Sequence, residues 1–251
     1  MILWKNSKHL IAGTTLRDIT KAEVNNMALH CGGNLDAVIE NRQALSETLD
    51  ISLAQWTFAQ QTHSDHVHYV TKDDIGKGAS TQADAISDCD ALYTRSKDIA
   101  IGVFHADCAA ILLHDPIENI ICAIHAGWMG TIQQITTKTI QQLLALEGCK
   151  AENLEAYIAP CIAFPSFEVG LEVVAQVKLL PFDTEPFIAY KDNGKALIDN
   201  KGLNHQMLLA AGILEKHITI DKNDTFQENE SFFSYRRDKT CGRHLSFILQ
   251  K

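Results

Sequence analysis

Three short segments of the chain contain the residue types that hold metal ions or act as nucleophiles. Gln60–His68 has three histidines, His105–Cys108 has a histidine and a cysteine, and His125–Gly130 starts with a histidine and includes two glycines. Thiolate and imidazole are preferred zinc ligands, and a catalytic zinc site has three protein ligands and one open position. The same residue types can instead form a Cys–His pair, in which the imidazole activates the thiol as a nucleophile. The spacing is compatible with both kinds of site.

Each of these residues also has a structural interpretation. A single histidine is more often a hydrogen-bonded surface residue than a ligand, and a single cysteine such as Cys108 is more often a small buried hydrophobe. The glycines Gly127 and Gly130 can simply shape a tight turn. The functional interpretation gains weight because the segments with Cys108 and His125 both follow predicted strands that could lie side by side.

The elements that must position these residues can be predicted from hydrophobic periodicity. Short apolar runs predict strands at 99–104, 109–113, 119–124, 154–158 and 245–249, and helical spacing predicts helices at 131–146, 169–180 and 204–214. Thr131 and Gln134 fit a capping box at the start of the first helix. Strands and helices mix without strict alternation, which predicts an α/β fold with a mixed sheet flanked by helices. We expect residues 1–251 to form a single domain, because no linker-like segment divides them.

Composition excludes several classes of function. The formal net charge is −9, whereas nucleic-acid binders usually carry a basic excess. No apolar stretch approaches the length of a membrane span, and the N-terminus does not have the pattern of a signal peptide. We therefore expect a cytoplasmic protein whose partners are small molecules, not nucleic acids or membranes. The odd number of cysteines, seven, and the lack of a CxxC pair indicate reduced thiols.

Six sequence segments, taken together and in order, resemble a known family. They are QQTHSDHV, CDALYT, HADCAAILLHDP, AIHAGWMGT, IAPCIAFPSFEVG and SFFSYRRDKTCGRHLSFIL, and ALHCGGNLDAVIENRQAL near the start is also similar. The chain resembles the YfiH/laccase-domain family over nearly its whole length. That family is named after multi-copper polyphenol oxidases and is also described as purine nucleoside phosphorylase and, in some bacteria, as peptidoglycan editing factor.

The resemblance implies a fold, a site and a reaction. The implied fold is a single α/β domain similar to the catalytic domain of cytotoxic necrotizing factor. The implied site is a zinc centre whose ligands correspond to His63, Cys108 and His125, with copper as a possible alternative metal. The implied reaction is phosphorolysis of adenosine, inosine and guanosine to the free base and ribose-1-phosphate. Adenosine deamination and methylthioadenosine cleavage are implied alongside it.

The chain departs from the family pattern at two positions. His105 stands where the family usually has threonine, which adds a possible extra ligand, and Met129 stands where it usually has arginine. Phosphorolysis needs a bound phosphate, so another cation should replace that arginine. Arg42 and Arg236 are the candidates, because both lie in segments that match the family and a planar guanidinium suits phosphate. The turn from His125 into the predicted helix could add backbone amides.

Three alternative functions remain open at this stage. The first is a copper-dependent, laccase-like polyphenol oxidase. Multi-copper centres need many histidine ligands, and the chain has only one HxH pair, His66 and His68. A cysteine hydrolase acting on a peptidoglycan precursor would use Cys108 as nucleophile and would work without metal. A zinc-stabilised binding module would unfold when its metal is removed.

Overall fold

The computed structural model describes residues 1–251, and most of its strands form two large sheets. The first sheet has, in order, β1 (Ile2–Asn6), β2 (Leu10–Thr14), β14 (His244–Gln250), β6 (Ala100–His105) and β3 (Trp56–Thr57). The second has β13 (Ile218–Ile220), β9 (Glu155–Ile158), β7 (Ala109–Asp115), β8 (Ile120–Ala126), β5 (Ala91–Thr94) and β4 (Val67–Tyr69). A small third sheet contains β10 (Glu168–Gly170), β12 (Lys195–Ile198) and β11 (Ile188–Tyr190).

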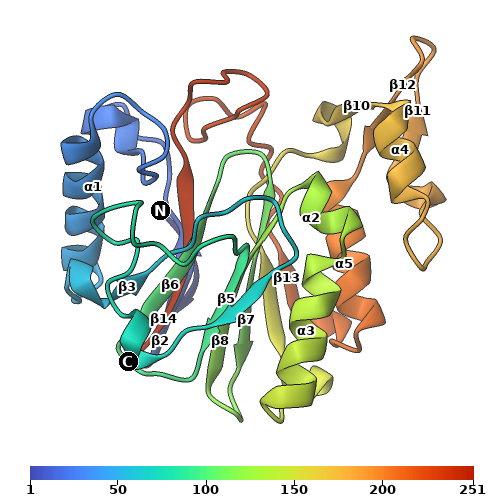
Figure 1. Ribbon diagram of the computed structural model, residues 1–251. Coiled ribbons are helices and arrows are strands. Elements are labelled where there is room, and N and C mark those ends of the chain that lie inside the picture. The colour runs from blue at the N-terminus through green and yellow to red at the C-terminus, as the bar shows by residue number, and fades with distance from the viewer.

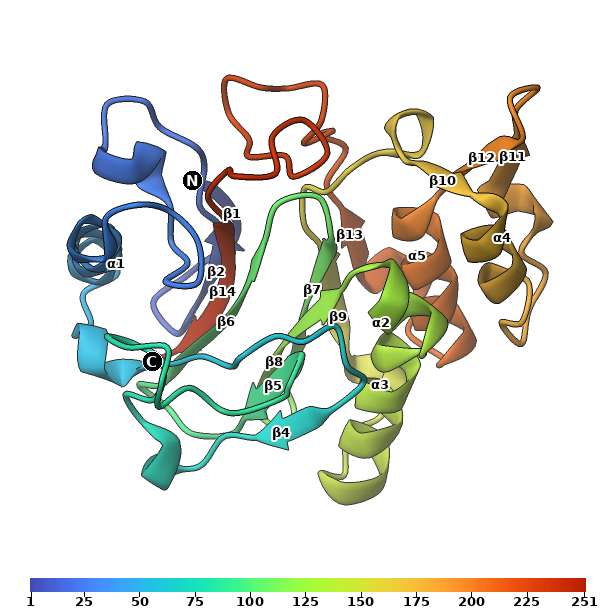
Figure 2. The ribbon, with the colours of Figure 1, turned by 45° about the horizontal axis from the view of Figure 1, so that its top comes forward.

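Helices cover the outer faces of the two large sheets (Figure 1). They are α1 (Leu35–Thr48), α2 (Trp128–Ile132), α3 (Ile135–Leu146), α4 (Leu171–Val177) and α5 (Asn200–Ala210). Helix α1 lies beside the five-stranded sheet, α3 and α5 lie beside the six-stranded sheet, and α4 packs with the small sheet (Figures 1 and 2). None of these helices is both long enough and apolar enough to span a lipid bilayer.

The hydrophobic core has layers that match this arrangement. One buried cluster joins Val103 of β6 to Leu112 of β7, and so fills the space between the two large sheets. A second joins Ile124 of β8 to Ile140 of α3. Strand β8 is buried along its whole length, because both faces of its sheet are covered. Its sequence is therefore a nearly continuous apolar run and does not alternate between apolar and polar residues.

The predicted mixed α/β fold is confirmed, since both large sheets combine parallel and antiparallel pairs. The predicted single helix over 131–146 is wrong. Gln134 has a left-handed backbone (φ 61°, ψ 38°) that separates α2 from α3. Thr131 lies inside α2 and does not cap a helix, because its hydroxyl accepts a hydrogen bond from Asn204 of α5 within a buried polar network. The predicted helix at 169–180 begins later, because Val169 pairs with Ala196 in the small sheet.

The connection from β6 to β7 determines where chemistry can occur. β6 belongs to the five-stranded sheet and β7 to the six-stranded sheet, so residues 106–108 carry the chain from one sheet to the other. β8 runs antiparallel beside β7, with Ala110 opposite His125. Cys108 therefore lies just before β7, next to the end of β8. The strand that it follows, β6, is in the other sheet and does not lie side by side with β8, as the sequence suggested.

Candidate metal centre

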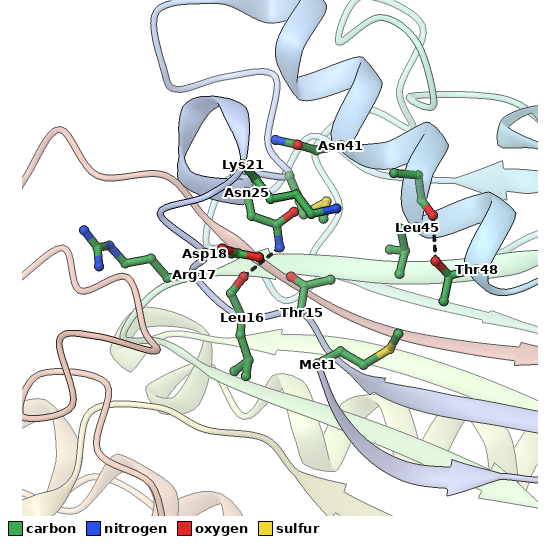
Figure 3. Close-up of a pocket in the computed structure, with 12 residues that line it drawn as sticks. Met1, Thr15, Leu16, Arg17, Asp18, Lys21, Asn25, Asn41, Leu45 and Thr48 are labelled. Carbon is green, nitrogen blue, oxygen red and sulfur yellow. Dashed lines mark hydrogen bonds between the residues drawn. The ribbon is translucent and has the colours of Figure 1, made fainter.

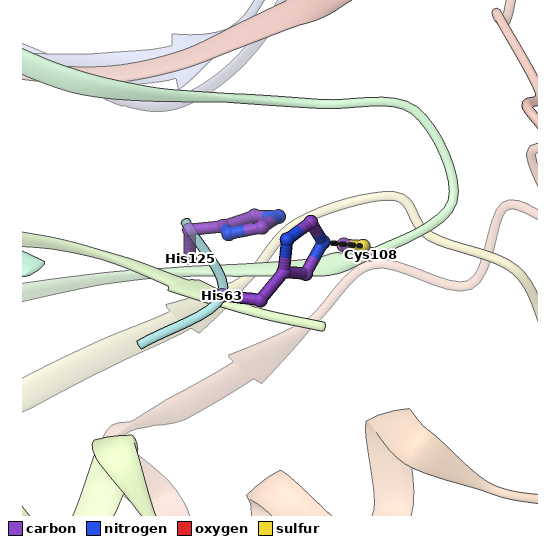
Figure 4. A group of neighbouring side chains, drawn as sticks. All are labelled: His63, Cys108 and His125. Atoms are coloured by element: carbon purple, nitrogen blue, oxygen red, sulfur yellow. Dashed lines mark hydrogen bonds between the residues drawn. The ribbon is translucent and has the colours of Figure 1, made fainter. Parts of the chain in front are cut away.

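His63, Cys108 and His125 come together at this crossover (Figure 4). Each offers one ligand atom, and the three atoms all lie within 4.8 Å of one another. The Cys108 Sγ is 4.0 Å from the His63 Nε2, and the two imidazole rings are 4.9 Å apart at an angle of 70°. His125 is buried, whereas His63 and Cys108 are partly exposed. The cluster is therefore buried on the side of His125 and partly exposed on the side of His63 and Cys108.

His125 is oriented by a carboxylate. Asp90 directly precedes β5, and the pairing of Ala91 with Ile124 places Asp90 beside His125. The His125 Nδ1 lies 2.7 Å from the Asp90 Oδ1, which leaves the Nε2 free to face the cluster. Burial would raise the pKa of Asp90, but its hydrogen bonds and the charge of His125 hold that pKa at about 2. Asp90 is therefore an ionised acceptor at neutral pH.

His63 lies in the loop between β3 and β4 and has a left-handed backbone, with φ 62°. This conformation is uncommon for residues other than glycine. The Asp90 carboxylate also holds this loop, because it accepts hydrogen bonds from the backbone amides of Thr62 (3.0 Å), His63 (3.2 Å) and Ser64 (2.8 Å). Gln133 adds a bond from its side-chain amide to the His63 carbonyl, at 2.9 Å. These hydrogen bonds hold the main chain at His63 in place.

The electrostatics of the cluster favour a thiolate. Burial would raise the pKa of Cys108, but the neighbouring His125 and His63 lower it to about 6. Burial would likewise lower the pKa of His125, but Cys108 and Asp90 raise it to about 9. A thiolate is the form of cysteine that binds metal ions or attacks electrophiles. Two imidazoles and one thiolate are a donor set that fits zinc.

Gly127 packs directly against the cluster. A Cβ atom at this position would lie 2.9 Å from the Cys108 Sγ and 2.9 Å from the His63 Cδ2. Contacts that short are not tolerated between non-bonded atoms. The glycine after β8 is therefore required by close approach to the candidate ligands, and not by an unusual φ.

Arg236, one of the two predicted anion contacts, lies on a loop tied to the cluster. Its backbone amide donates to the carboxylate of Asp107, the residue before Cys108, at 2.7 Å. Its guanidinium lies over the Phe167 ring at 5.5 Å and donates to the Glu168 carbonyl at 2.8 Å. The side chain is otherwise exposed, so further N–H groups remain available to an anion.

Arg42, the other predicted anion contact, has a structural role instead, and that prediction is wrong. The residue is only 2% exposed. Its guanidinium donates to the carbonyls of Met27, Gly78 and Ala79 at 2.7–2.8 Å and also packs against two aromatic rings. The Arg42 Nη2 has no hydrogen-bond partner, but it is buried with the rest of the guanidinium beneath carbonyl oxygens and aromatic rings, where a phosphate in solution does not reach it.

The other histidines near these segments do not join the cluster. His105, predicted as a possible extra ligand, ends β6 in the five-stranded sheet, where it is buried with its Nε2 2.7 Å from the Ser246 hydroxyl. His66 bonds to Asp88 and His68 bonds to Asp74. Each ring therefore has a partner away from the candidate ligands.

A separate hollow lies between α1 and the first strands (Figure 3). Its lining includes Arg17, Lys21 and Asn41. None of the three candidate ligands lines it, so this hollow is separate from the candidate metal site.

Sequence reasoning missed two residues that build the site. Asp90 appears in the segment CDALYT, but nothing in the sequence links it to His125. Asp107 accepts hydrogen bonds from the hydroxyls of Thr225 and Ser234 as well as from the Arg236 amide. The sequence signals were weak: Asp107 directly precedes the candidate ligand Cys108, and Asp90 directly precedes the strand β5.

Comparison with known proteins agrees with this architecture. A purine nucleoside phosphorylase, YlmD of Bacillus subtilis (strain 168), is 32% identical over 98% of this chain and 91% of its own length. The crystal structure of YlmD from Geobacillus stearothermophilus has a TM-score of 0.92 at 30% identity, covering 100% of this chain and 99% of that one. The crystal structure of Bacillus licheniformis hypothetical protein YfiH has a TM-score of 0.93 at 30% identity, covering 96% and 93%. The family model described as multi-copper polyphenol oxidoreductase laccase matches residues 16–251. The resemblance noted in the sequence is confirmed, and the chain belongs to this laccase-like family.

Proposed function

We propose that this protein is a zinc-dependent purine nucleoside phosphorylase that also deaminates adenosine and cleaves methylthioadenosine. The proposal is supported by relatives at 29–33% identity that are named purine nucleoside phosphorylases. It is also supported by the convergence of His63, Cys108 and His125. Its substrates would be a purine nucleoside and phosphate.

The observation that carries the metal assignment is that two imidazoles converge on one thiolate. A cysteine nucleophile needs one imidazole as its base, and His125 with Asp90 behind it would already supply that base. His63 would then have no role, yet its Nε2 is directed at Cys108. Three ligands of these types with one side exposed are what a catalytic zinc site requires.

The proposed site has metal ligands, a residue that orients one of them and a phosphate contact. His63, Cys108 and His125 would hold the zinc ion, which when bound supplies a Lewis acid with an open coordination position. Asp90 would keep the His125 Nδ1 protonated and its Nε2 directed at the ion. Arg236 would bind phosphate through the N–H groups that its protein contacts leave unused.

Phosphorolysis exchanges one bond at the anomeric carbon of ribose. A phosphate oxygen forms a bond to this carbon as the bond to the purine nitrogen breaks, and the purine leaves with the electron pair and takes up a proton. Deamination differs, because water replaces the amino group at C6 and releases ammonia without using phosphate. The two reactions therefore make different demands on an anion site.

A cysteine hydrolase is the second candidate, and one observation favours it. Cys108, His125 and Asp90 are arranged as thiolate, imidazolium and carboxylate, and the pKa of Cys108 is lowered to about 6. Such a pair can attack an acyl carbon without a metal. A multi-copper oxidase has less support, because only one group of residues in the structure is suited to hold an ion.

One experiment separates these functions. Purified protein is analysed for zinc and then incubated with adenosine, with and without phosphate, before and after treatment with a chelator. We expect about one zinc per chain, adenine and ribose-1-phosphate only when phosphate is present, inosine under both conditions, and loss of all products after chelation. Near-zero zinc with activity that survives chelation would instead support the cysteine hydrolase.

A further inference from the structure

The carboxylate of Asp90 contacts both histidines of the cluster, the ring of His125 and the backbone amide of His63. The side chain is 1% exposed. It accepts from the His125 Nδ1 at 2.7 Å and from the Ser64 hydroxyl at 2.9 Å. It also accepts from the backbone amides of residues 62–64. We infer that Asp90 is the positioning residue of the metal centre, fixing the tautomer of one histidine ligand and the backbone of the other. This inference rests on the proposed metal site.

The contact with His125 determines which ring nitrogen is free. A metal-bound imidazole is neutral and carries one N–H, and the nitrogen without it is the one that binds the metal. An ionised carboxylate accepts and cannot donate, so Asp90 requires the proton to be on the Nδ1. The Nε2 then presents its lone pair to the cluster. A carboxylate behind a histidine ligand generally orients the ring and strengthens its basicity.

The contacts with residues 62–64 act on His63 in a different way. His63 has a left-handed backbone, and a strained residue of this kind persists only when its surroundings over-determine it. Three consecutive amides donating to one carboxylate provide that constraint. The aspartate therefore connects two loops, and both histidine rings depend on its negative charge.

Substitution by asparagine tests this with almost no change in volume. An amide has one acceptor oxygen and one donor nitrogen, whereas all of the partners of Asp90 are donors. If the amide nitrogen of Asp90→Asn faces His125, it drives the ring proton to the Nε2 and blocks metal binding. If it faces residues 62–64, it opposes backbone N–H groups and releases the His63 loop. Both orientations should weaken the site.

Asp74 offers a matched control for the loss of a buried, hydrogen-bonded carboxylate. It is 6% exposed and accepts from the Thr71 amide and hydroxyl, from Lys77 and from His68. It has no contact with the candidate ligands. Asp74→Asn should therefore destabilise the fold in a similar manner without changing metal affinity.

The experiment measures zinc affinity by competition with a chromophoric chelator for the wild type, Asp90→Asn and Asp74→Asn. The absorption spectrum of the Co²⁺-loaded proteins reports ligand geometry independently of activity. We expect a loss of about 10- to 100-fold in zinc affinity and an altered Co²⁺ spectrum for Asp90→Asn, and wild-type behaviour for Asp74→Asn. Equal affinity in all three proteins, or equal weakening in both variants, would overturn the inference. A wild type that binds no zinc would instead refute the proposed metal centre itself.

Ser64→Ala provides a second test if Asp90→Asn does not fold. It removes one hydroxyl donor from Asp90 and leaves the backbone amide in place. The loss of one such hydrogen bond should reduce zinc affinity roughly two- to tenfold. Unchanged affinity would count against a positioning role for the carboxylate.

Discussion

The close approach of Gly127 to the cluster makes Gly127→Ala a sensitive probe of the metal assignment. The backbone at this residue has φ −61° and ψ 170°, which alanine adopts without strain. The added methyl group therefore acts only through its contacts. Those contacts are with the Cys108 Sγ and the His63 Cδ2, each 2.9 Å from the new Cβ.

The size of the effect follows from these distances. Ordinary non-bonded contacts begin near 3.5 Å, so atoms at 2.9 Å must move apart by about 0.6 Å. Metal–ligand distances tolerate deviations of only about 0.2 Å. Two of the three ligands would be displaced by several times that tolerance. We expect zinc affinity to fall at least about tenfold, which is the loss seen when a residue that hydrogen-bonds to a metal ligand is removed. Turnover should fall about 100-fold, as for a misplacement of about 1 Å.

The assay compares zinc affinity, phosphorolysis rate and thermal melting of the metal-free protein for Gly127→Ala and Gly33→Ala. Gly33 is a suitable control, because its added Cβ would meet only the Glu23 carboxylate at 3.6 Å. Overpacking at Gly127 should cost about 1–3 kcal/mol of unfolding free energy, which leaves the protein folded. If Gly127→Ala binds zinc as tightly as the wild type, the Cys108 and His63 side chains do not hold an ion together.

Other substitutions test single assignments. Cys108→Ala should abolish turnover while circular dichroism and melting change little, because catalytic ligands contribute mainly to function; inactivity caused only by unfolding would make the site structural. His68→Ala should keep substantial activity, since its ring bonds to Asp74; a loss as complete as that of His63→Ala would mean that the wrong histidine was chosen. Arg236→Ala should sharply raise the phosphate concentration needed for phosphorolysis while sparing adenosine deamination, measured side by side. Equal loss of both reactions, or of neither, would remove this residue from the anion site.

The parts of the fold that the sequence predicted well are those set by local hydrophobic patterning. Strands β7 and β8 appear in the sequence as uninterrupted apolar runs, because each is covered on both faces. The ends of the predicted strands at 99–104 and 119–124 identified Cys108 and His125 as neighbours. The reason was only partly right, since Cys108 precedes β7 at a crossover between sheets and the antiparallel register brings it to His125.

The parts that could not be predicted depend on partners far away in the sequence. The break at Gln134 is accompanied by a hydrogen bond from Asn204 on another helix to Thr131. Arg42 lies in a segment that matches the family, but its guanidinium turns inward to the carbonyls of Gly78 and Ala79. Asp90 lies 35 residues from His125 along the chain. Hydrophobic periodicity carries no information about such pairings.

The electrostatics of Cys108 do not choose between a metal ligand and a nucleophile, because a lowered thiol pKa suits both. The backbone of His63 favours the metal ligand. A left-handed conformation at a histidine costs about 1–3 kcal/mol, and here several hydrogen bonds to Asp90 and Gln133 maintain it. In a thiol–imidazole–carboxylate hydrolase built on His125, nothing would require that conformation. In the proposed metal centre the same conformation presents the His63 Nε2 to the Cys108 thiolate, so the proposal gives the strained backbone a function that the hydrolase does not.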